Sequence, residues 1–395
     1  MNDKSPRVLS DLSLHGDKRR LLFLVTELYY FRSHKIEVAA TAAKSGFDVI
    51  VAARPDRDLF ANDDLRAIAL DWRRSGSLIG AAFQFFPELY RVRKILNEVK
   101  PDVLHNIALK PAILGSLAAV GTNTKVINSI NGFGFVFHDK SVLAKIVQKL
   151  CGVILRLSVR ANDARIVLQN RDDESFAHSH LGVPRAHLRL IAGSGVDTDS
   201  FTPSSEPRGR PFKFLILARL LYIKGIHIAI AAHRILREQG FEQELVICGV
   251  RDEGNPSAIS ADTIARWSEI PGAVFKGQLE DIRPQISDSH VVLHPALGGE
   301  GLPKALLEAA SSGRAIIASD VSGNREIVIS GKTGLLVPPD NPEALAAAMR
   351  RAMEQPEERH SWATAARTRV EAEFSLTSVL DQHSSLYREF LPVTV

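Results

Sequence analysis

The chain has 395 residues, of which 45% are hydrophobic and 24% charged, and its formal net charge is +4. This length exceeds one ordinary core, and the balance of apolar and charged residues excludes a disordered or fibrous chain, so two globular domains are expected. The charge is uneven, because residues 1–200 carry 28 Lys and Arg against 21 Asp and Glu, whereas residues 201–395 carry 21 against 24. The first half is therefore expected to meet any anionic partner or surface.

Cysteine usage and hydropathy exclude further classes of protein. Only two cysteines occur, Cys151 and Cys248, both in apolar surroundings, so neither a disulfide framework nor a cysteine metal site is expected. The first residues lack the apolar core of a signal peptide, and no run approaches the ~18 apolar residues of a membrane span. We therefore expect a cytoplasmic protein whose contact with a membrane is peripheral.

The first half alternates apolar runs with helical periodicity after a flexible tail at 1–18. This alternation predicts a parallel α/β domain over 19–201. Strands are expected at 21–25, 47–53, 66–70, 102–105, 125–130, 165–168 and 189–192, and helices at 32–45, 83–97, 111–120 and 141–160.

The second half repeats the same rhythm after a Pro-, Ser- and Gly-rich linker at 202–211, which predicts a second α/β domain over 212–375. Strands are expected at 212–218, 244–248, 273–276, 291–293, 315–318 and 334–337, and helices at 224–239, 262–267, 303–312, 342–353, 360–373 and 376–390. Ligands of open α/β sheets bind outside the carboxyl ends of the strands. We therefore expect two Rossmann-like domains facing across a cleft that holds the ligand.

The stretch from Ser289 to Gly313 combines a short apolar strand, a Gly-rich turn and a helix that Pro303 would start. A helix N-terminus carries unpaired N–H groups and a partial positive charge, and glycines before it let an anion approach the backbone. Glu300 in the turn and Glu308 in the helix could bind hydroxyls on either side of that anion. The alternative is that Glu308 pairs with Lys304 at i, i+4 and that Glu300 is a solvated loop residue.

Two cations follow the strand at 212–218. Arg219 and Lys224 lie in the turn before the next helix, where a guanidinium can bind two phosphate oxygens and an ammonium adds a compact charge. Two solvated loop cations are the alternative reading. Together with Glu300 and Glu308, however, this pair suits a nucleotide sugar, which presents sugar hydroxyls, a diphosphate and a ribose diol.

These motifs resemble a known family. The segments ARLLYIKG, EGLPKALLE, SDVSGNREIVISGKTGLLVPPDNPEAL and IAGSGVDTDSF resemble retaining glycosyltransferases of family 4 with the GT-B fold. The segments TELYYFRSH, HNIALKPAILGS and INGFGFVF resemble a bacterial branch of that family that builds lipid-linked surface polysaccharides such as lipopolysaccharide, capsule or exopolysaccharide. The resemblance covers residues 20–375 and implies a metal-independent hexosyltransferase without a cofactor.

The resemblance also implies roles for single residues. Arg219 and Lys224 would bind the donor diphosphate, and Glu300 would contact the donor sugar, so these three are the expected catalytic residues. Gly301 and Leu302 would offer backbone N–H groups, and Glu308 would hold the ribose of a donor that is most commonly a UDP-sugar. The first domain would bind a lipid-linked or growing saccharide, with the last helix (376–395) packing back on it.

The acceptor side departs from the family pattern. The loop after the first strand, Thr26 to His34, contains no glycine, and Asn131 stands before Gly132 where relatives place a histidine. The candidate acceptor-side residues are His34, His105, Lys110 and Asn131, and for the two histidines and the lysine a structural role is the alternative. His294 is interpreted as a residue for packing or backbone bonding, and Asp197-Thr198-Asp199 as part of the interdomain segment, not a metal site, so no metal is expected.

The helix expected at 141–160 predicts contact with an anionic membrane. Apolar residues at helical spacing (Leu143, Ile146, Val147, Leu150, Ile154 and Leu157) lie beside the basic residues Lys145, Lys149, Arg156 and Arg160, and no acid occurs from 140 to 162. A core-facing helix with a solvated basic side is the alternative. The cluster Phe83, Phe85 and Phe86, followed by Arg91, Arg93 and Lys94, is a second candidate.

The expected function is thus transfer of a sugar at the inner face of the plasma membrane, without a nucleic-acid partner. A nucleotide-sugar epimerase on the same fold and a non-catalytic nucleotide-sugar-binding protein are the alternatives. An epimerase would change the donor without an acceptor, and a binding protein would not need the set Arg219, Lys224, Glu300 and Glu308.

Overall fold

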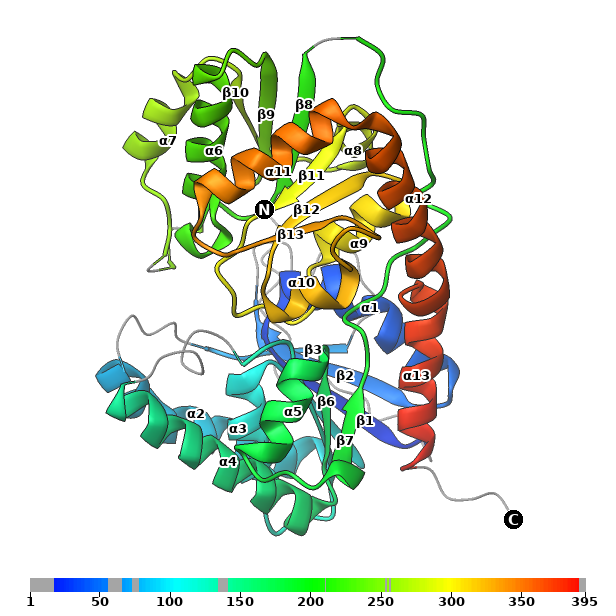
Figure 1. Cartoon of the computed structure of the whole chain (residues 1–395). Coiled ribbons are helices and arrows are strands. Elements are labelled where there is room, and N and C mark those ends of the chain that lie inside the picture. The colour runs from blue at the N-terminus through cyan, green and yellow to red at the C-terminus, as the bar shows by residue number, and fades with distance from the viewer. Residues whose placement is uncertain are drawn as a thin grey trace, which may run out of the picture. The chain divides into compact units, whose positions relative to one another are not determined.

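The computed structural model describes residues 18–55, 66–72, 78–133, 141–209, 211–252, 254–255 and 257–390, without the side chains of residues 78–82 and 143. The chain divides into two compact units, the first formed by residues 1–194 and 379–395 and the second by residues 195–378 (Figure 1). Most of the predicted tail at 1–18 lies outside the described residues.

The first unit alternates strands and helices along most of its length. Its elements are β1 (Arg20–Glu27), α1 (Leu28–Lys44), β2 (Asp48–Arg54), β3 (Arg66–Ala69), α2 (Leu78–Val99), β4 (Val103–Ile107), α3 (Leu109–Ala119), β5 (Lys125–Ile130), α4 (Val142–Asn162), β6 (Arg165–Leu168), α5 (Arg171–Ser179), a 3₁₀ turn (Arg185–His187), β7 (Leu188–Leu190) and most of α13 (Leu376–Arg388).

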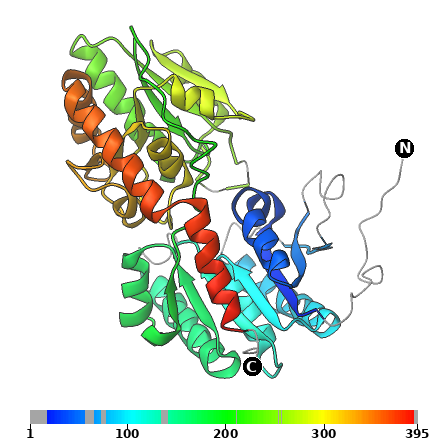
Figure 2. The ribbon, with the colours of Figure 1, turned by 90° about the vertical axis from the view of Figure 1, so that its right-hand side faces the viewer.

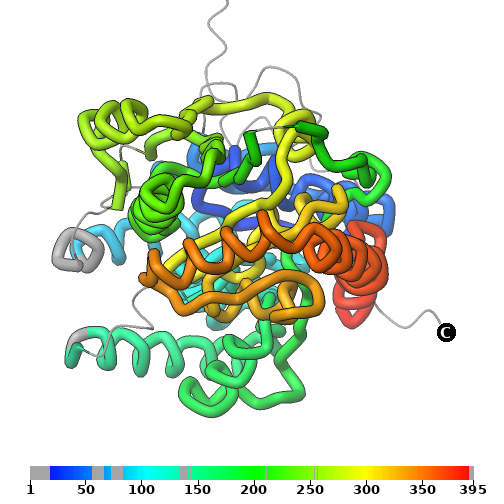
Figure 3. Tube along the Cα trace, turned by 45° about the horizontal axis from the view of Figure 1, so that its top comes forward, coloured from blue at the N-terminus to red at the C-terminus, as the bar shows by residue number. Residues whose placement is uncertain are grey.

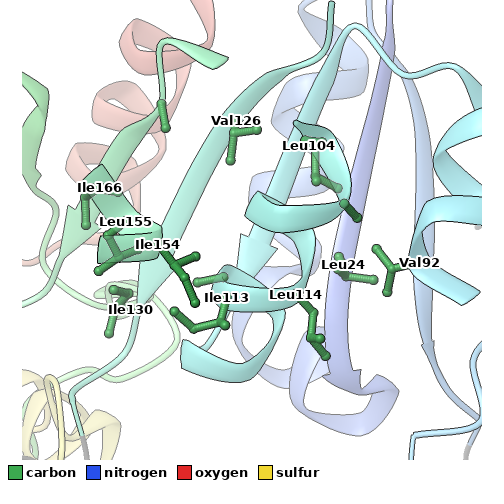
Figure 4. Close-up of a cluster of buried hydrophobic side chains, with 14 of the residues drawn as sticks. Leu24, Val92, Leu104, Ile113, Leu114, Val126, Ile130, Ile154, Leu155 and Ile166 are labelled. Carbon is green, nitrogen blue, oxygen red and sulfur yellow. The ribbon is translucent and has the colours of Figure 1, made fainter. Parts of the chain in front are cut away.

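The seven strands of this unit form one parallel sheet in the order β3-β2-β1-β4-β5-β6-β7. Side chains alternate between the faces of a strand, and here both faces are buried. Leu22 and Leu24 of β1 join a cluster with α2, α3, α4 and α5, whereas Leu21, Phe23 and Val25 join a cluster with α1 and α13. Figure 4 shows Leu24 in the first cluster with Val92 of α2, Leu114 of α3 and Ile154 of α4. The unbroken apolar run of β1 therefore reflects a central strand between two helical layers.

Helix α13 belongs to the second of these layers although it lies at the far end of the chain (Figure 2, red). Val379, Leu386 and Tyr387 are buried against the sheet face that α1 also covers. Beyond the helix, Glu389 forms ion pairs with Arg165 (2.7 Å) and Arg189 (2.9 Å). The last helix is thus an integral part of the first unit.

The second unit has the same alternation. Its elements are β8 (Phe212–Leu217), a 3₁₀ turn η4 (Tyr222–Lys224), α6 (Ile226–Glu238), β9 (Gln243–Cys248), α7 (Ala261–Ser268), β10 (Ala273–Gly277), α8 (Arg283–Ser287), β11 (Val291–His294), α9 (Lys304–Ser311), β12 (Ala315–Ser319), α10 (Ser322–Ile327), β13 (Leu335–Val337), α11 (Pro342–Glu354) and α12 (Pro356–Glu373).

Its six strands form a parallel sheet in the order β10-β9-β8-β11-β12-β13. Helices α6 and α11 lie side by side on one face (Figure 3), where Phe214 and Ile216 of β8 join their apolar side chains. Leu215, between them, points to the other face and is equally buried. The predicted class, two parallel α/β domains, is confirmed.

The segment predicted as a linker at 202–211 is bound to the second unit over its described part. The buried Arg314 donates to the carbonyl oxygens of Ser204 (2.7 Å) and Ser205 (3.1 Å), and Arg359 pairs with Glu206 (2.7 Å). The boundary between the units falls earlier, between Ser194 and Gly195. A Pro- and Ser-rich composition therefore marks irregular backbone here, not a free tether.

Several local predictions were wrong or incomplete. Helix α1 begins at Leu28, not at residue 32, and β4 continues two residues past His105, whereas α5, α8 and α10 were not predicted. Cys151 and Cys248 are buried and unpaired, as expected. Of the helices in the described ranges, none combines the length and apolarity needed to cross a bilayer.

Candidate functional site

The candidate site lies where the strand order of the second sheet reverses. Strands β8 and β11 are neighbours, and the connections from them run in opposite directions, to β9 and to β12. Such a switch point leaves a crevice at the carboxyl ends of the strands in open α/β sheets. The turns that leave the two strands are joined there, because the N–H of Leu297 donates to the carbonyl oxygen of Ile223 at 2.8 Å.

The side chain of Glu300 connects these two turns. One carboxylate oxygen pairs with the Nζ of Lys224, and the other is 2.9 Å from Nε2 of His294. Lys224 ends the 3₁₀ turn after β8, whereas His294 is the last residue of β11. The structure therefore brings together two predicted residues, Lys224 and Glu300, and adds His294, for which the sequence favours packing or backbone bonding.

Burial determines the charges of Lys224 and His294 in the cluster that they form with Glu300. It lowers the pKa of Lys224 to about 7, with a smaller contribution from the charge of Arg219. Burial also lowers the pKa of His294 to about 3, and the charge of Lys224 acts in the same direction. His294 is therefore neutral at pH 7. An added diphosphate would favour the charged form of Lys224, because an opposite charge stabilises an ammonium.

Arg219 lies just beyond β8 and has a different partner. Its guanidinium pairs with Asp252 at 2.7 Å, and its side chain is 47% exposed, against 18% for Lys224. The guanidinium is thus held by an acidic residue of the loop after β9 while much of it faces solvent. Asp252 was not predicted as part of the site, because it is distant in sequence from both strands.

The turn after Lys224 requires a glycine. Gly225 has a φ of +71°, and a Cβ added to it would lie 1.8 Å from the carbonyl oxygen of Pro295. The two turns therefore approach backbone to backbone, which no other residue permits. This close approach places the Lys224 ammonium next to the Gly-rich turn that carries Glu300.

Helix α9 begins directly after that turn. Gly301 and Leu302 are buried at its start, and Pro303 occupies the N-cap position with extended backbone. Glu308 is buried in the second turn and pairs with Lys304 at 3.5 Å, which is the i, i+4 contact of the alternative reading. Burial nevertheless raises the pKa of Glu308 to about 7, with Lys304 opposing the shift.

The corresponding edge of the first sheet carries a chain of polar side chains. The Nδ2 of Asn131 donates to the Tyr30 hydroxyl, and its Oδ1 accepts from Gln169, both at 2.8 Å. These residues follow β1, β5 and β6, so they lie at the carboxyl ends of three strands. Tyr30 and Gln169 were not predicted, because neither residue type at the end of a strand is a specific signal.

Two other acceptor-side candidates lie in the N-terminal halves of α1 and α3, the helices that follow β1 and β4. His34 is half-buried in α1 and stacks on Tyr30 with ring centroids 4.2 Å apart. Lys110 is the second residue of α3, pairs with the buried Glu88 at 2.7 Å and lies 4.9 Å above the Trp72 ring. Ala108, just before α3, has a φ of +83°, a strained conformation for a residue with a side chain.

The prediction that His105 faces an acceptor was wrong. Its side chain is fully buried inside β4, with Nδ1 2.8 Å from the Tyr387 hydroxyl and Nε2 2.7 Å from the Ser129 hydroxyl. Burial lowers its pKa well below the usual value. Since both ring nitrogens are bonded within the core and α13 covers the ring, His105 cannot touch a ligand.

Helix α4 divides its apolar residues between two faces. Ile154 and Leu155 are buried in the first core, as in the core-facing alternative. The opposite face exposes a second apolar stripe consisting of Val142 (75%), Ile146 (57%), Leu150 (58%), Val153 (51%) and Leu157 (39%). Lys145, Lys149 and Arg160 are exposed beside it, whereas Arg156 donates to the carbonyl oxygen of Leu181.

Metal ligands are not clustered in the described part of the chain, where no group of three or more His, Cys, Asp and Glu residues could hold an ion. The carboxylate of Asp197 accepts instead from the backbone N–H of Asp199 (3.0 Å) and Ser200 (3.1 Å). It therefore stabilises a local turn.

Two parallel α/β units are the architecture of the GT-B class, and the comparisons identify the family. Residues 197–369 match the family described as "Glycosyl transferases group 1", and residues 20–167 match "Glycosyl transferase 4-like". A glycogen synthase of Mycobacterium tuberculosis is 30% identical over 354 residues, which cover 87% of this chain and 80% of that protein. The chain belongs to the group 1, family 4 glycosyltransferases.

Two further relatives are named as bacterial glycosyltransferases. A protein of Salmonella typhimurium named "Putative colanic acid biosynthesis glycosyltransferase WcaL" is 34% identical over 175 residues, which is 42% of each chain. The match therefore spans less than half the length of that relative. An N,N'-diacetylbacillosaminyl-diphospho-undecaprenol alpha-1,3-N-acetylgalactosaminyltransferase of Campylobacter jejuni is 24% identical over 322 residues, which cover 78% of this chain and 81% of that enzyme.

Solved structures share the fold. A sucrose-phosphate synthase from Thermosynechococcus elongatus superposes with a TM-score of 0.77 at 20% identity and covers 94% of this chain and 99% of its own. HepE of Anabaena, solved in complex with UDP, superposes with a TM-score of 0.73 at 16% identity and covers 94% of this chain and 100% of its own. At these identities the likeness shows the GT-B fold alone.

Proposed function

We propose that the chain is a retaining, metal-independent hexosyltransferase that moves a sugar from a nucleotide-sugar donor to a lipid-linked or growing saccharide of a bacterial surface polysaccharide. The observation that carries this proposal is the Lys224–Glu300 pair at the β8/β11 switch point, with Arg219 in the same turn as Lys224. Two cations and a carboxylate at this place suit a diphosphate joined to a sugar.

Each residue has a part in binding the donor. Arg219 and Lys224 bind the diphosphate, and the N–H groups of Gly301 and Leu302 add hydrogen bonds at the start of α9. Glu300 accepts from sugar hydroxyls and Glu308 from the ribose diol. The donor is a UDP-sugar in this proposal, which the UDP complex of the structural neighbour HepE supports.

The chemistry is displacement of the diphosphate on one face of the sugar. A C–O bond forms between the anomeric carbon and the acceptor hydroxyl, and the bond from that carbon to the diphosphate oxygen breaks. The hydroxyl proton passes to the departing diphosphate. Arg219 and Lys224 stabilise the charge that develops on the leaving group, so the step needs neither a protein nucleophile nor a metal.

The first unit binds the acceptor in this proposal. Asn131, His34 and Lys110 offer polar contacts at the carboxyl ends of its strands, and Tyr30 and Gln169 extend the set. The Campylobacter relative, whose name includes a diphospho-undecaprenol acceptor, supports a lipid-linked saccharide.

The test is a transfer assay on the full-length protein with EDTA present. The lysine variant Lys224→Ala should lower kcat/KM by about 100- to 1000-fold, since removing one donor from a developing anion has an effect of this order. The control Lys332→Ala removes an exposed lysine of the same unit and should leave turnover unchanged. NMR of the product should show the anomeric configuration of the donor. The proposal would be refuted by loss of activity in EDTA or by a product with inverted anomeric configuration. A donor sugar that is altered in the absence of any acceptor would also refute it and would favour an epimerase.

We further propose that the first unit binds the cytoplasmic face of an anionic membrane through α4. The exposed apolar stripe of this helix, with Lys145 and Lys149 beside it, suits the boundary between headgroups and acyl chains. Helix α2 packs on the other side of α3 and exposes Phe83 (80%), Phe86 (74%) and Tyr90 (71%). Large exposed aromatic and apolar residues on two helices of one layer are unusual for a surface that meets only water.

Co-sedimentation with vesicles tests this membrane contact. The double variant Lys145→Glu/Lys149→Glu should weaken partitioning into vesicles with an anionic lipid by about 30-fold or more, because each basic residue contributes about 1 kcal/mol. The control Lys276→Glu/Lys332→Glu changes the net charge equally through exposed lysines of the second unit. Equal binding of both variants would refute the assignment to α4.

A further inference from the structure

His294 has an arrangement that the donor-binding roles leave unexplained. Its side chain is 5% exposed, and its Nε2 lies 2.9 Å from the Glu300 carboxylate oxygen that Lys224 does not contact. One carboxylate is therefore held from two sides. The two supports differ, since one is a ring at the end of a buried strand and the other an ammonium on a flexible stem.

The protonation of this pair is determined by its surroundings. His294 is neutral at pH 7, because burial and the Lys224 charge both disfavour its protonated form. A carboxylate only accepts hydrogen bonds, so the neutral ring must carry its proton on Nε2 and donate it to Glu300. A hydrogen bond to a charged group is among the stronger ones, and this bond leaves no second charge in the cluster.

The backbone of His294 is fixed by its neighbours. Its carbonyl oxygen lies 3.4 Å from the hydroxyl of Ser319 and 3.4 Å from the amide of Asn324, and β12 pairs with β11 along its whole length. The next residue, Pro295, is the one that approaches Gly225. The imidazole therefore starts from a backbone position that β12, Ser319 and Asn324 hold in place.

The two supports respond differently to a donor. A diphosphate attracts the Lys224 ammonium, which then divides its charge between the phosphate and Glu300. The neutral ring has no such attraction and keeps its bond to the carboxylate. We propose that His294 is a positioning residue that fixes Glu300 against the sugar portion of the donor, an inference that rests on the donor site proposed above.

This role predicts that the loss of His294 affects the affinity for a nucleotide sugar but not the affinity for a nucleoside diphosphate. Glu300 meets the sugar and not the diphosphate, so loss of the imidazole should weaken a nucleotide sugar without weakening the nucleoside diphosphate alone. A histidine that served only to fill the core would affect both ligands to the same extent, through folding. Calorimetry on the full-length protein measures both affinities.

The variants His294→Phe and His294→Gln make the comparison, with UDP as one probe and the UDP-sugar that the wild type binds best as the other. Phenylalanine keeps a ring but has no donor, and we expect about 10-fold weaker binding of the UDP-sugar with UDP within about twofold. Glutamine places an amide donor near the position of Nε2 and should restore binding to within about threefold. The double variant His294→Phe/Glu300→Gln should lose as much affinity for the UDP-sugar as Glu300→Gln alone, because His294 acts through Glu300.

Three results would overturn the inference. His294→Phe could weaken the affinity for UDP and for the UDP-sugar equally, or leave the affinity for the UDP-sugar unchanged. The double variant could show the sum of the two single losses of affinity. Each of these leaves the donor site itself intact, since the wild type still binds and transfers. A wild-type protein that binds neither probe would overturn the donor site and this inference together.

Discussion

Replacing Glu308 by glutamine tests the cost of a buried carboxylate in the proposed ribose site. Burial raises the pKa of Glu308 from 4.5 to about 7, even though Lys304 lies 3.5 Å away. The unfolded chain loses this proton near pH 4.5, so stability falls as the pH rises from there to about 7. Since one pKa unit corresponds to about 1.4 kcal/mol, the ionised form destabilises the fold by about 3 kcal/mol above pH 7.

The variant Glu308→Gln removes this ionisation. At pH 5 the wild-type side chain is protonated and resembles the amide, so the two melting temperatures should be similar. At pH 8 the variant should melt roughly 6–12 °C higher, because a domain of this size gains about 2–4 °C per kcal/mol. The same substitution should weaken nucleotide-sugar binding, which would show that the carboxylate is kept for its ligand.

Differential scanning calorimetry at both pH values provides the measurement. Glu280→Gln, in an exposed loop of the same unit, is the matched control. Its difference in melting temperature from wild type should be the same at pH 5 and at pH 8. A difference between Glu308→Gln and wild type that is the same at pH 5 and pH 8, or a variant that is less stable at pH 8, would refute the reasoning.

Three further predictions concern the framework of the two units. His383 is fully buried, and neither of its ring nitrogens has a hydrogen-bond partner among the described residues. Burial, together with the charges of Lys35 and His105, lowers the pKa of His383 well below the usual value. Because the unfolded chain binds this proton near pH 6.5 and the folded chain does not, stability should fall as the pH drops below about 6.5. His383→Leu should flatten that decline in urea titrations between pH 7.5 and 5.5, and an unchanged slope would contradict it. Arg314→Met should destabilise the second unit by about 3 kcal/mol, because four backbone carbonyl oxygens lose a charged hydrogen-bond donor. Residues 202–206 should then become accessible to proteolysis, and a variant that is cleaved in the same pattern as wild type would contradict the prediction. Gly225→Ala should abolish nucleotide binding, measured by calorimetry, while Gly240→Ala, a positive-φ glycine with open space around it, should only lower stability.

The strands could be predicted because parallel sheets bury both faces. A continuous apolar run such as residues 21–25 is too short for a buried helix, and both of its faces must be covered, which a central parallel strand achieves. Helix α5 escaped prediction because Ala177 is its only buried residue, so it has no apolar periodicity. Its N-terminus did carry a signal, since Asn170 caps the N–H of Asp173 and acidic residues follow in the first turn.

The sequence indicated the charged candidates of the proposed site but not their contacts. Arg219, Lys224 and Glu300 could be chosen because each follows a predicted strand. His294 could not, because local sequence does not reveal that the Gly-rich turn folds back over the end of its own strand. The error at His105 has the same origin, since α13, more than 270 residues later, covers it.

The contact between Gly225 and Pro295 has a practical consequence for anyone who wishes to change donor preference. Because one turn touches the other through main-chain atoms, inserting or enlarging residues in either would displace Lys224 from Glu300. Randomised libraries are better directed to the Arg219–Asp252 pair, where the guanidinium still has open space around it. The proposed donor site thus combines a part in which the backbone leaves no room for larger residues with a part that can be redesigned.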